Sequence, residues 1–185
     1  MRRALGRWTG LGSIDLREAE AVDLVADVAP HIISVEGPIE EDVLIGRMRE
    51  AWDLDRAGRI VQASVRKALK RLAGRESAVR TGTAWDLPGR EVATARTPSA
   101  DFDRKKVSHV PPTERQVALL GVLSEPPCLR REELARQAAR FFGWLRLGAD
   151  IRAAFDKDID ALIARNAVEE GPAGLVSVED GSLSG

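Results

Sequence analysis

The chain has 185 residues, of which 44% are hydrophobic, 4% aromatic and 31% charged, and its formal net charge is −1. These values exclude a disordered chain and a polycation, so any affinity for nucleic acid has to come from a local basic patch. Cys128 is the one cysteine, which excludes an internal disulfide and a multi-cysteine metal site.

The first predicted helix covers Leu16 to Val28, with its apolar residues on one face. Pro30 should end this helix, because proline cannot continue a helix and biases the residue before it towards extended conformations. The β-branched run at 32–35, Ile-Ile-Ser-Val, then predicts a short strand.

Two further helices and a hairpin follow. The second helix is expected over Glu40 to Trp52, because its acidic first turn suits the helix dipole. The third is expected over Arg59 to Ala73, after a turn in which Gly58 would supply a positive φ. The segment from Val79 to Leu87 alternates around a central glycine and predicts a hairpin.

A second set of the same elements follows a polar segment without periodicity. Its first helix opens with Thr113 and Gln116, which have the spacing of a capping box, and ends before Pro126. Its other elements are helices over Glu132 to Phe142 and Ile151 to Arg165 and a hairpin over Ala167 to Val178. The predicted boundaries are a flexible segment over 1–13, modules over 14–87 and 112–178, a linker over 88–111 and a disordered tail over 179–185.

The two modules are related by a shift of ninety positions. The matches are Ile39 with Leu129, Leu44 with Leu134, Trp52 with Phe142, Leu54 with Trp144 and Arg56-Ala57-Gly58 with Arg146-Leu147-Gly148. After a gap of one residue, the match resumes with Ile60 on Ile151, Ser64 on Phe155, Ala68 on Ile159 and Leu72 on Ile163. Because the apolar positions are shared, we expect the matched aromatic residues to lie in two similar cores.

The element order predicts the fold class. Helix, short strand, helix, turn, helix and hairpin is the order of a winged helix-turn-helix, in which the third helix usually enters DNA. We therefore expect a mostly α protein with small β-hairpin wings, built as tandem winged helix-turn-helix modules. Three-helix units of other kinds have the same periodicity and are the alternative.

The third helix of the first module has the strongest charge signal. Between Arg56 and Arg75, seven residues are basic and none is acidic. Helical periodicity turns Val61, Ser64, Val65, Ala68 and Leu72 inward and leaves a basic outer face. Such a face suits the DNA major groove, where arginine binds guanine, glutamine binds adenine and lysine neutralises phosphates. The predicted DNA-binding residues are Arg59, Gln62, Arg66, Lys67, Lys70 and Arg80. A solvated face and a docking face for an acidic partner are the alternatives.

The third helix of the second module differs in charge. Its outer face is predicted to carry Asp150, Ala153, Lys157, Asp160, Ala161 and Ala164, with Asp156 and Asp158 nearby. Phosphates would be repelled by this surface, so we expect the second module to make protein contacts.

Candidates for catalysis are few. The histidines are His31 and His109, Cys128 lies apart at a strand-like position that we expect to be buried, and no nucleophile occurs in a recognisable motif. Metal ligands at usable spacing are lacking. No segment approaches the roughly 20 apolar residues of a membrane span, and no signal peptide is recognised at the basic start of the chain. We therefore expect a soluble, cytoplasmic, non-enzymatic protein without cofactor or metal.

Two runs carry a family resemblance: 35–42, Val-Glu-Gly-Pro-Ile-Glu-Glu-Asp, and 48–60, Met-Arg-Glu-Ala-Trp-Asp-Leu-Asp-Arg-Ala-Gly-Arg-Ile. They resemble an uncharacterised bacterial domain found at the carboxyl end of superfamily 1 helicases that also carry a Vsr-like nuclease. The resemblance covers about Ile32 to Val178 and implies a place in DNA processing or defence, with no catalytic or binding residues to carry over. Neither helicase nor nuclease is present here, and the chain lacks the Gly-x-x-x-x-Gly-Lys-Ser/Thr phosphate loop.

Two functional hypotheses follow. The first is a non-catalytic DNA-binding accessory module, in which the first module contacts duplex DNA and the second contacts protein. The second is a protein–protein adaptor within a helicase–nuclease assembly. Salt dependence of duplex binding separates the two, because a complex with phosphates loses affinity with log salt at a slope of about −0.9 per neutralised phosphate.

Overall fold

The computed structural model describes residues 15, 18, 20–97, 106–125 and 128–178. The chain forms two compact units, Met1–Glu91 and Val92–Gly185. The segments predicted to be flexible or disordered, 1–13 and 179–185, and part of the predicted linker, 98–105, lie outside the described residues. Within the described ranges, no helix is long and apolar enough to cross a membrane.

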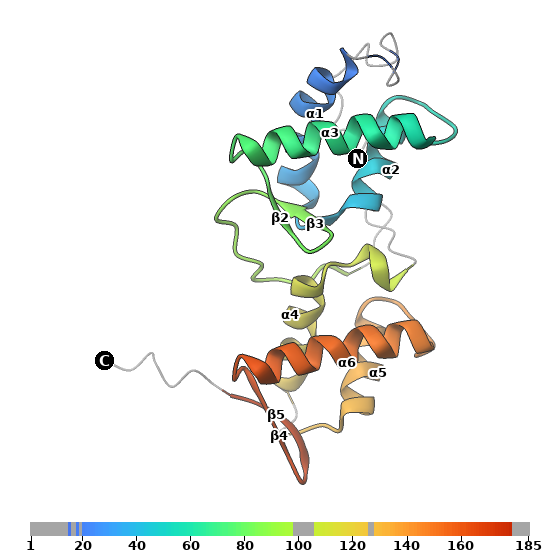
Figure 1. Ribbon diagram of the computed structural model, residues 1–185. Helices are drawn as coiled ribbons and strands as arrows, with labels where there is room; N and C mark the ends of the chain where they lie inside the picture. Colours follow the sequence, from blue (N-terminus) through green and yellow to red (C-terminus); the bar gives the residue numbers. More distant parts are fainter. Residues whose placement is uncertain (1–14, 16–17, 19, 98–105, 126–127, 179–185) are drawn as a thin grey trace. The chain divides into compact units, whose positions relative to one another are not determined.

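The described residues of unit 1 form three helices and a small antiparallel sheet (Figure 1). Its elements are α1 (Ala21–Glu36), β1 (Ile39–Glu40), α2 (Glu41–Ala51), α3 (Arg59–Gly74), β2 (Val79–Thr81) and β3 (Ala84–Asp86). The strand order is β1-β3-β2, and Ile39 on β1 lies opposite Trp85 on β3. The core is closed by the apolar faces of α1, α2 and α3, with Trp52 and Trp85 buried in it.

The helix α1 differs from its prediction, because Pro30 lies inside it and the helix continues to Glu36. Proline in a helix costs about 3 kcal/mol or more. Ile32 and Ile33 are only 4% and 0% exposed, and burying each such side chain contributes about 1.5 to 3 kcal/mol. Packing of the last helical turns therefore offsets the proline, and the strand predicted over 32–35 is wrong.

The later elements of unit 1 follow the prediction to within one or two residues. Gly82 forms the hairpin turn with a φ of 62°, as expected from its central place in the alternating run. Gly58 was expected to have a positive φ, but its φ is −64° and it caps α3 in an extended conformation. The positive φ in this connection belongs to Asp53, at 52°.

Unit 2 repeats the arrangement (Figure 1). Its elements are the 3-10 helix η2 (Val107–His109), α4 (Pro112–Leu123), α5 (Arg131–Phe141), α6 (Ala149–Ala164), β4 (Val168–Gly171) and β5 (Gly174–Ser177). A single bridge joins Leu129 to Leu175 in place of the β1–β3 pairing. The predicted capping box is wrong, because Pro111 is the N-cap and no side chain caps the helix. Pro112 at the first helical position has the fixed φ that a helix start favours.

The ninety-residue shift holds without a gap. The pairs Ile39–Trp85 and Leu129–Leu175 are ninety apart at both ends, and so are α3 and α6. In the third helices, the buried Val65, Leu69 and Leu72 correspond to the buried Phe155, Ile159 and Leu162. The one-residue gap inferred from the sequence is therefore wrong, and Ile60 does not share the place of Ile151.

Candidate nucleic-acid interface

The outer surface of α3 is basic. Val61, Val65, Ala68, Leu69 and Leu72 face the core, and the opposite surface is formed by the exposed residues Arg59, Ile60, Ala63, Lys67 and Lys70. We call these five residues the α3 crest. Among the described residues, none forms a hydrogen bond or ion pair with the side chains of Arg59, Lys67 or Lys70. Three cations on one exposed strip are thus available to an anionic ligand.

A polar network borders the crest on the side of the hairpin. Arg66 donates from Nε to Glu41 Oε1 at 2.7 Å, and Trp85 Nε1 donates to Glu41 Oε2 at 3.2 Å. Arg80 Nη2 lies 3.9 Å from the same carboxylate, and its guanidinium lies 5.8 Å from the centre of the Trp85 ring. The network joins α2, α3 and the hairpin through one carboxylate.

Glu41 is ionised in this network. Burial alone would raise its pKa, but hydrogen bonds from Arg66 and Trp85 and the charges of Arg66 and Arg80 outweigh that effect and lower it. Arg66 and Arg80 are therefore partly neutralised, although their side chains remain 45% and 48% exposed. Arg66 and Arg80 can still contact an anionic ligand, but they attract it less than the unpaired cations of the crest do.

Gln62 was predicted to bind bases, and the structure places it away from the crest. Its side chain is half-buried, and Nε2 donates to the carbonyl oxygen of Ala57 at 2.9 Å. On the opposite border of α3, Arg71 forms an ion pair with Asp23. Of the six predicted residues, Arg59, Lys67 and Lys70 are therefore exposed and unpaired among the described residues, while Arg66, Arg80 and Gln62 have partners.

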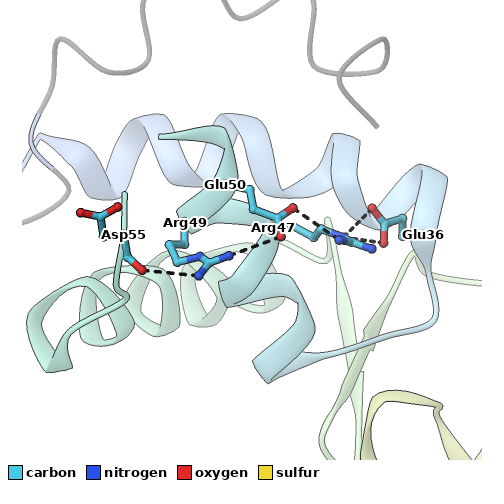
Figure 2. A network of polar contacts seen from close by, with 5 residues as sticks. All are labelled: Glu36, Arg47, Arg49, Glu50 and Asp55. Atoms are coloured by element: carbon cyan, nitrogen blue, oxygen red, sulfur yellow. Dashed lines mark hydrogen bonds and ion pairs between the residues drawn. The ribbon is translucent and has the colours of Figure 1, made fainter. Parts of the chain in front are cut away.

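Other arginines of unit 1 have structural roles. Figure 2 shows Arg47 donating from Nε to both carboxylate oxygens of Glu36, at 3.0 and 2.9 Å, which ties α2 to the end of α1. Glu50 links Arg47 to Arg49, and Arg49 donates to the carbonyl of Asp55 (Figure 2). These arginines hold the helices together and add little free positive charge.

The part of the predicted linker described before residue 98 is also held by arginines. Arg90 donates to the carbonyl oxygens of Ser34 and Gly37 at 2.8 and 2.9 Å, at the end of α1. Arg96 binds the buried Glu114 of unit 2, with Nη2 to Oε2 at 2.9 Å. Arg90 thus fixes the start of the linker to unit 1 and Arg96 fixes a later part of it to unit 2, which polar composition alone did not predict.

In unit 2 the corresponding network has the opposite charges. Arg131 occupies the place of Glu41, ninety positions later, and binds Glu170 at 2.7 Å and Asp160 at 2.7 Å. Glu170 and Asp160 occupy the places of Arg80 and Lys70. Hydrogen bonds from Arg131 lower the pKa of Glu170, and those to Glu170 and Asp160 raise the pKa of Arg131. The exposed face of α6 carries the residues predicted for it, Asp150, Ala153, Lys157, Asp160, Ala161 and Ala164.

Asp158, which was expected near the exposed face of α6, is instead only 3% exposed. Its carboxylate accepts hydrogen bonds from Arg115 at 2.5 and 3.2 Å. Burial raises the pKa of Asp158, and the charge and hydrogen bonds of Arg115 only partly oppose this effect. In unit 1 the corresponding residues are Val25 and Ala68, both fully buried.

The residues considered for catalysis lie apart. His31 is exposed on α1, and His109 is half-buried in η2. Cys128, expected to be buried, is half-buried, with Sγ 3.8 Å from the carbonyl oxygen of Ala173. In the part of the chain that the structure describes, no three His, Cys, Asp or Glu side chains are grouped to hold a metal ion.

A family model described as "Protein of unknown function (DUF3320)" matches residues 15–63, which include α1, α2 and the first turn of α3. No curated protein and no solved structure matches the chain. Residues 15–63 are therefore similar to a domain of unknown function. The matched range includes the exposed Arg59 but ends before Lys67 and Lys70.

Proposed function

We propose that the protein is a non-catalytic DNA-binding accessory module and that both of its units are winged helices. Three helices followed by a hairpin, with the third helix exposed, support this fold. The unpaired cations Arg59, Lys67 and Lys70 on the α3 crest are the observation that carries the function. Their partner is duplex DNA, and unit 2 contacts protein.

The length of the crest suits a duplex. Arg59 and Lys70 are eleven residues apart on a helix, which corresponds to about 17 Å at 1.5 Å per residue. A B-DNA major groove is about 12 Å wide. The two ends of the crest can therefore reach phosphates on both sides of the groove while Ala63, a small residue at its centre, permits close approach.

The chain as a whole has a net charge of −1, so salt-dependent binding to DNA would have to come from a local basic surface such as the α3 crest. Each phosphate neutralised contributes about −0.9 to the slope of log affinity against log salt, so four contacts, by Arg59, Arg66, Lys67 and Lys70, predict a slope near −3.6.

Fluorescence anisotropy with a labelled random duplex at several salt concentrations tests the proposal. The double variant Lys67→Ala and Lys70→Ala should bind more weakly and flatten the slope by about 1.8. Lys157→Ala is the matched control, because Lys157 occupies the place of Lys67 in unit 2. If the double variant keeps the wild-type slope, α3 is not the contact surface.

A protein–protein adaptor in a helicase–nuclease assembly is the second candidate. It is favoured by features of unit 2: Leu145 is 93% exposed in the turn before α6, and a cleft of about 450 Å³ lies between α4, α5 and the segment 93–95. The resemblance to a domain of helicases that carry a Vsr-like nuclease suggests the assembly in which such an adaptor would act. Co-purification of a helicase or nuclease with the full chain, lost in Leu145→Ser, together with no duplex binding at low salt, would favour the adaptor over the DNA-binding module.

A further inference from the structure

An aliphatic side chain lies among the cations of the α3 crest. Ile60 is 58% exposed, more than any other large hydrophobic residue in the described part of unit 1. It does not pack against the core of that unit. Its burial against a partner would add most of the stabilisation that an aliphatic side chain can give, so Ile60 is available for an apolar contact outside the chain.

The position of Ile60 indicates the kind of contact. It is the second residue of α3, three residues before the exposed Ala63, and both belong to the crest. Residues i and i+3 of a helix are neighbours on its surface. Ile60 and Ala63 thus form a small apolar spot bordered by Arg59 at the helix start and by Lys67 one turn beyond.

Duplex DNA offers an apolar group with matching surroundings. The C5-methyl group of thymine projects into the major groove between phosphate-lined walls, and proteins distinguish thymine through apolar contacts with it. The first residues of a third helix are those that contact base edges when the helix enters the groove. Gln62 is less suited to this role, because its amide is bound to the carbonyl of Ala57.

We propose that Ile60 contacts the C5-methyl group of thymine, while the small Ala63 leaves room beside it, and that this contact makes α3 selective for thymine-containing duplexes. This assignment rests on the proposed DNA-binding function and names a specificity determinant within it. The cations of the crest supply affinity for any duplex, while Ile60 supplies the preference. Burial of one methyl group corresponds to about fourfold in affinity.

Alternating duplexes of adenine with thymine and of adenine with uracil test the proposal, because uracil in DNA lacks only the C5-methyl group. The full chain should bind the thymine duplex about fourfold more tightly in anisotropy at one salt concentration. Ile60→Ala should bind the two duplexes equally, with its salt slope unchanged. The variant should fold, because the side chain is exposed and alanine is a better helix former.

Two variants complete the design. Ile60→Leu should retain the thymine preference, since it keeps an aliphatic side chain at this place. Val35→Ala, which shortens another exposed aliphatic residue of unit 1, 48% exposed on α1, is the matched control and should also retain it. Measuring each variant on both duplexes cancels any effect of the methyl group on the stiffness of the DNA.

The outcomes separate the two proposals. Equal binding of both duplexes by the wild-type chain would overturn the role of Ile60 and leave DNA binding intact. A thymine preference that persists in Ile60→Ala would overturn it as well, since another residue would then be responsible. Binding of neither duplex at low salt would overturn the proposed function, and the role of Ile60 with it.

Discussion

Replacement of Arg115 by methionine should destabilise unit 2 strongly. Arg115 binds Asp158 in the core and also donates to the carbonyl oxygens of Val107 and Val110. The two side chains of the pair are only 9% and 4% exposed. Removing one partner of a buried ion pair costs about 3 to 5 kcal/mol, because the other charge stays buried. We therefore expect Arg115→Met to cost about 4 kcal/mol at neutral pH.

The second substitution Asp158→Ala should recover part of this loss. It removes the stranded carboxylate and restores the residue type that unit 1 has at this place, Ala68. The carbonyls of Val107 and Val110 still lack their donor, and an unsatisfied buried acceptor costs about 1 to 3 kcal/mol. The double variant should therefore be more stable than Arg115→Met by about 2 kcal/mol.

The pH dependence of Arg115→Met has a defined sign. Burial already raises the pKa of Asp158 above its ordinary value of 3.8, and loss of the arginine raises it further. A raised carboxyl pKa means that the folded state binds the proton more tightly than the unfolded state does. The stabilisation by proton binding is therefore fully present below about pH 3.8 and is lost as the pH rises through the pKa of the folded state. The variant should thus lose most stability at neutral pH and recover part of it in acid, whereas the double variant should lack this dependence.

Peptide-resolved hydrogen exchange on the full chain measures these effects in each unit separately. A loss of 4 kcal/mol corresponds to about 10³-fold faster exchange in α4 and α6 where opening of the whole unit limits exchange. Peptides from unit 1 serve as the internal control. If the single and double variants exchange equally fast at pH 7, the stranded charge is not the cause and the reasoning is refuted.

Three further predictions follow from contacts in each unit. Gly37→Ala should lower the Tm, because the new Cβ would lie 2.5 Å from a backbone oxygen of α1, a clash costing about 1 to 3 kcal/mol. Gly58→Ala meets no atom within 4 Å and should lower the Tm less, since its cost is only the lower preference of alanine for a helix N-cap. Glu41→Gln should lower the free energy of unfolding of unit 1 by about 1 kcal/mol above pH 4.5, and by less as the pH falls through the lowered pKa of the folded state. Urea unfolding at pH 7 and in acid measures this loss, and an equal loss at both would show that the charge of Glu41 is irrelevant. Phe142→Ala should cost about 3 to 5 kcal/mol in the unfolding of unit 2, and Leu145→Ala, 93% exposed, should cost almost nothing; similar costs would contradict the assigned core.

Apolar periodicity predicted most elements, because each helix needs one buried face. It located α2, α3, α5, α6 and both hairpins to within a few residues. It failed at Pro30, where a local rule for proline was given more weight than two buried isoleucines in the next turn. Local propensity costs a few kcal/mol, and packing of a helix against a core can exceed that.

An error in the inferred repeat concealed the exposure of Ile60. The inferred gap matched Ile60 with Ile151 and so gave it a core position, whereas uninterrupted numbering matches Val61 with Ile151. Helical spacing already placed Ile60 about 140° around the helix from the inward-facing Val65, so the signal was in the sequence. The partners of Arg66 and Gln62 could not be predicted, since the residue that binds Arg66 is twenty-five positions away and the acceptor of Gln62 is a backbone oxygen.

Comparison of the two networks separates what the fold requires from what the surface does. Glu41 with Arg66 and Arg80, and Arg131 with Asp160 and Glu170, each join the third helix to the hairpin from the start of the preceding helix. An ion pair forms at this junction with either arrangement of signs. The helix dipole favours a carboxylate at the start of the preceding helix by only about 0.3 to 1 kcal/mol, so the fold tolerates both arrangements.

The sign does decide the surface around the third helix. The network of unit 1 leaves one excess positive charge beside three unpaired cations, and that of unit 2 leaves one excess negative charge. Ala68 and Asp158 show that the cores also differ, but there the change is compensated inside the unit by Arg115. The charge on the two outer faces is not compensated among the described residues of each unit. A difference that the fold tolerates in either form and leaves exposed to solvent is the kind expected where two copies of one fold meet different partners, an anionic one at α3 and a non-phosphate one at α6.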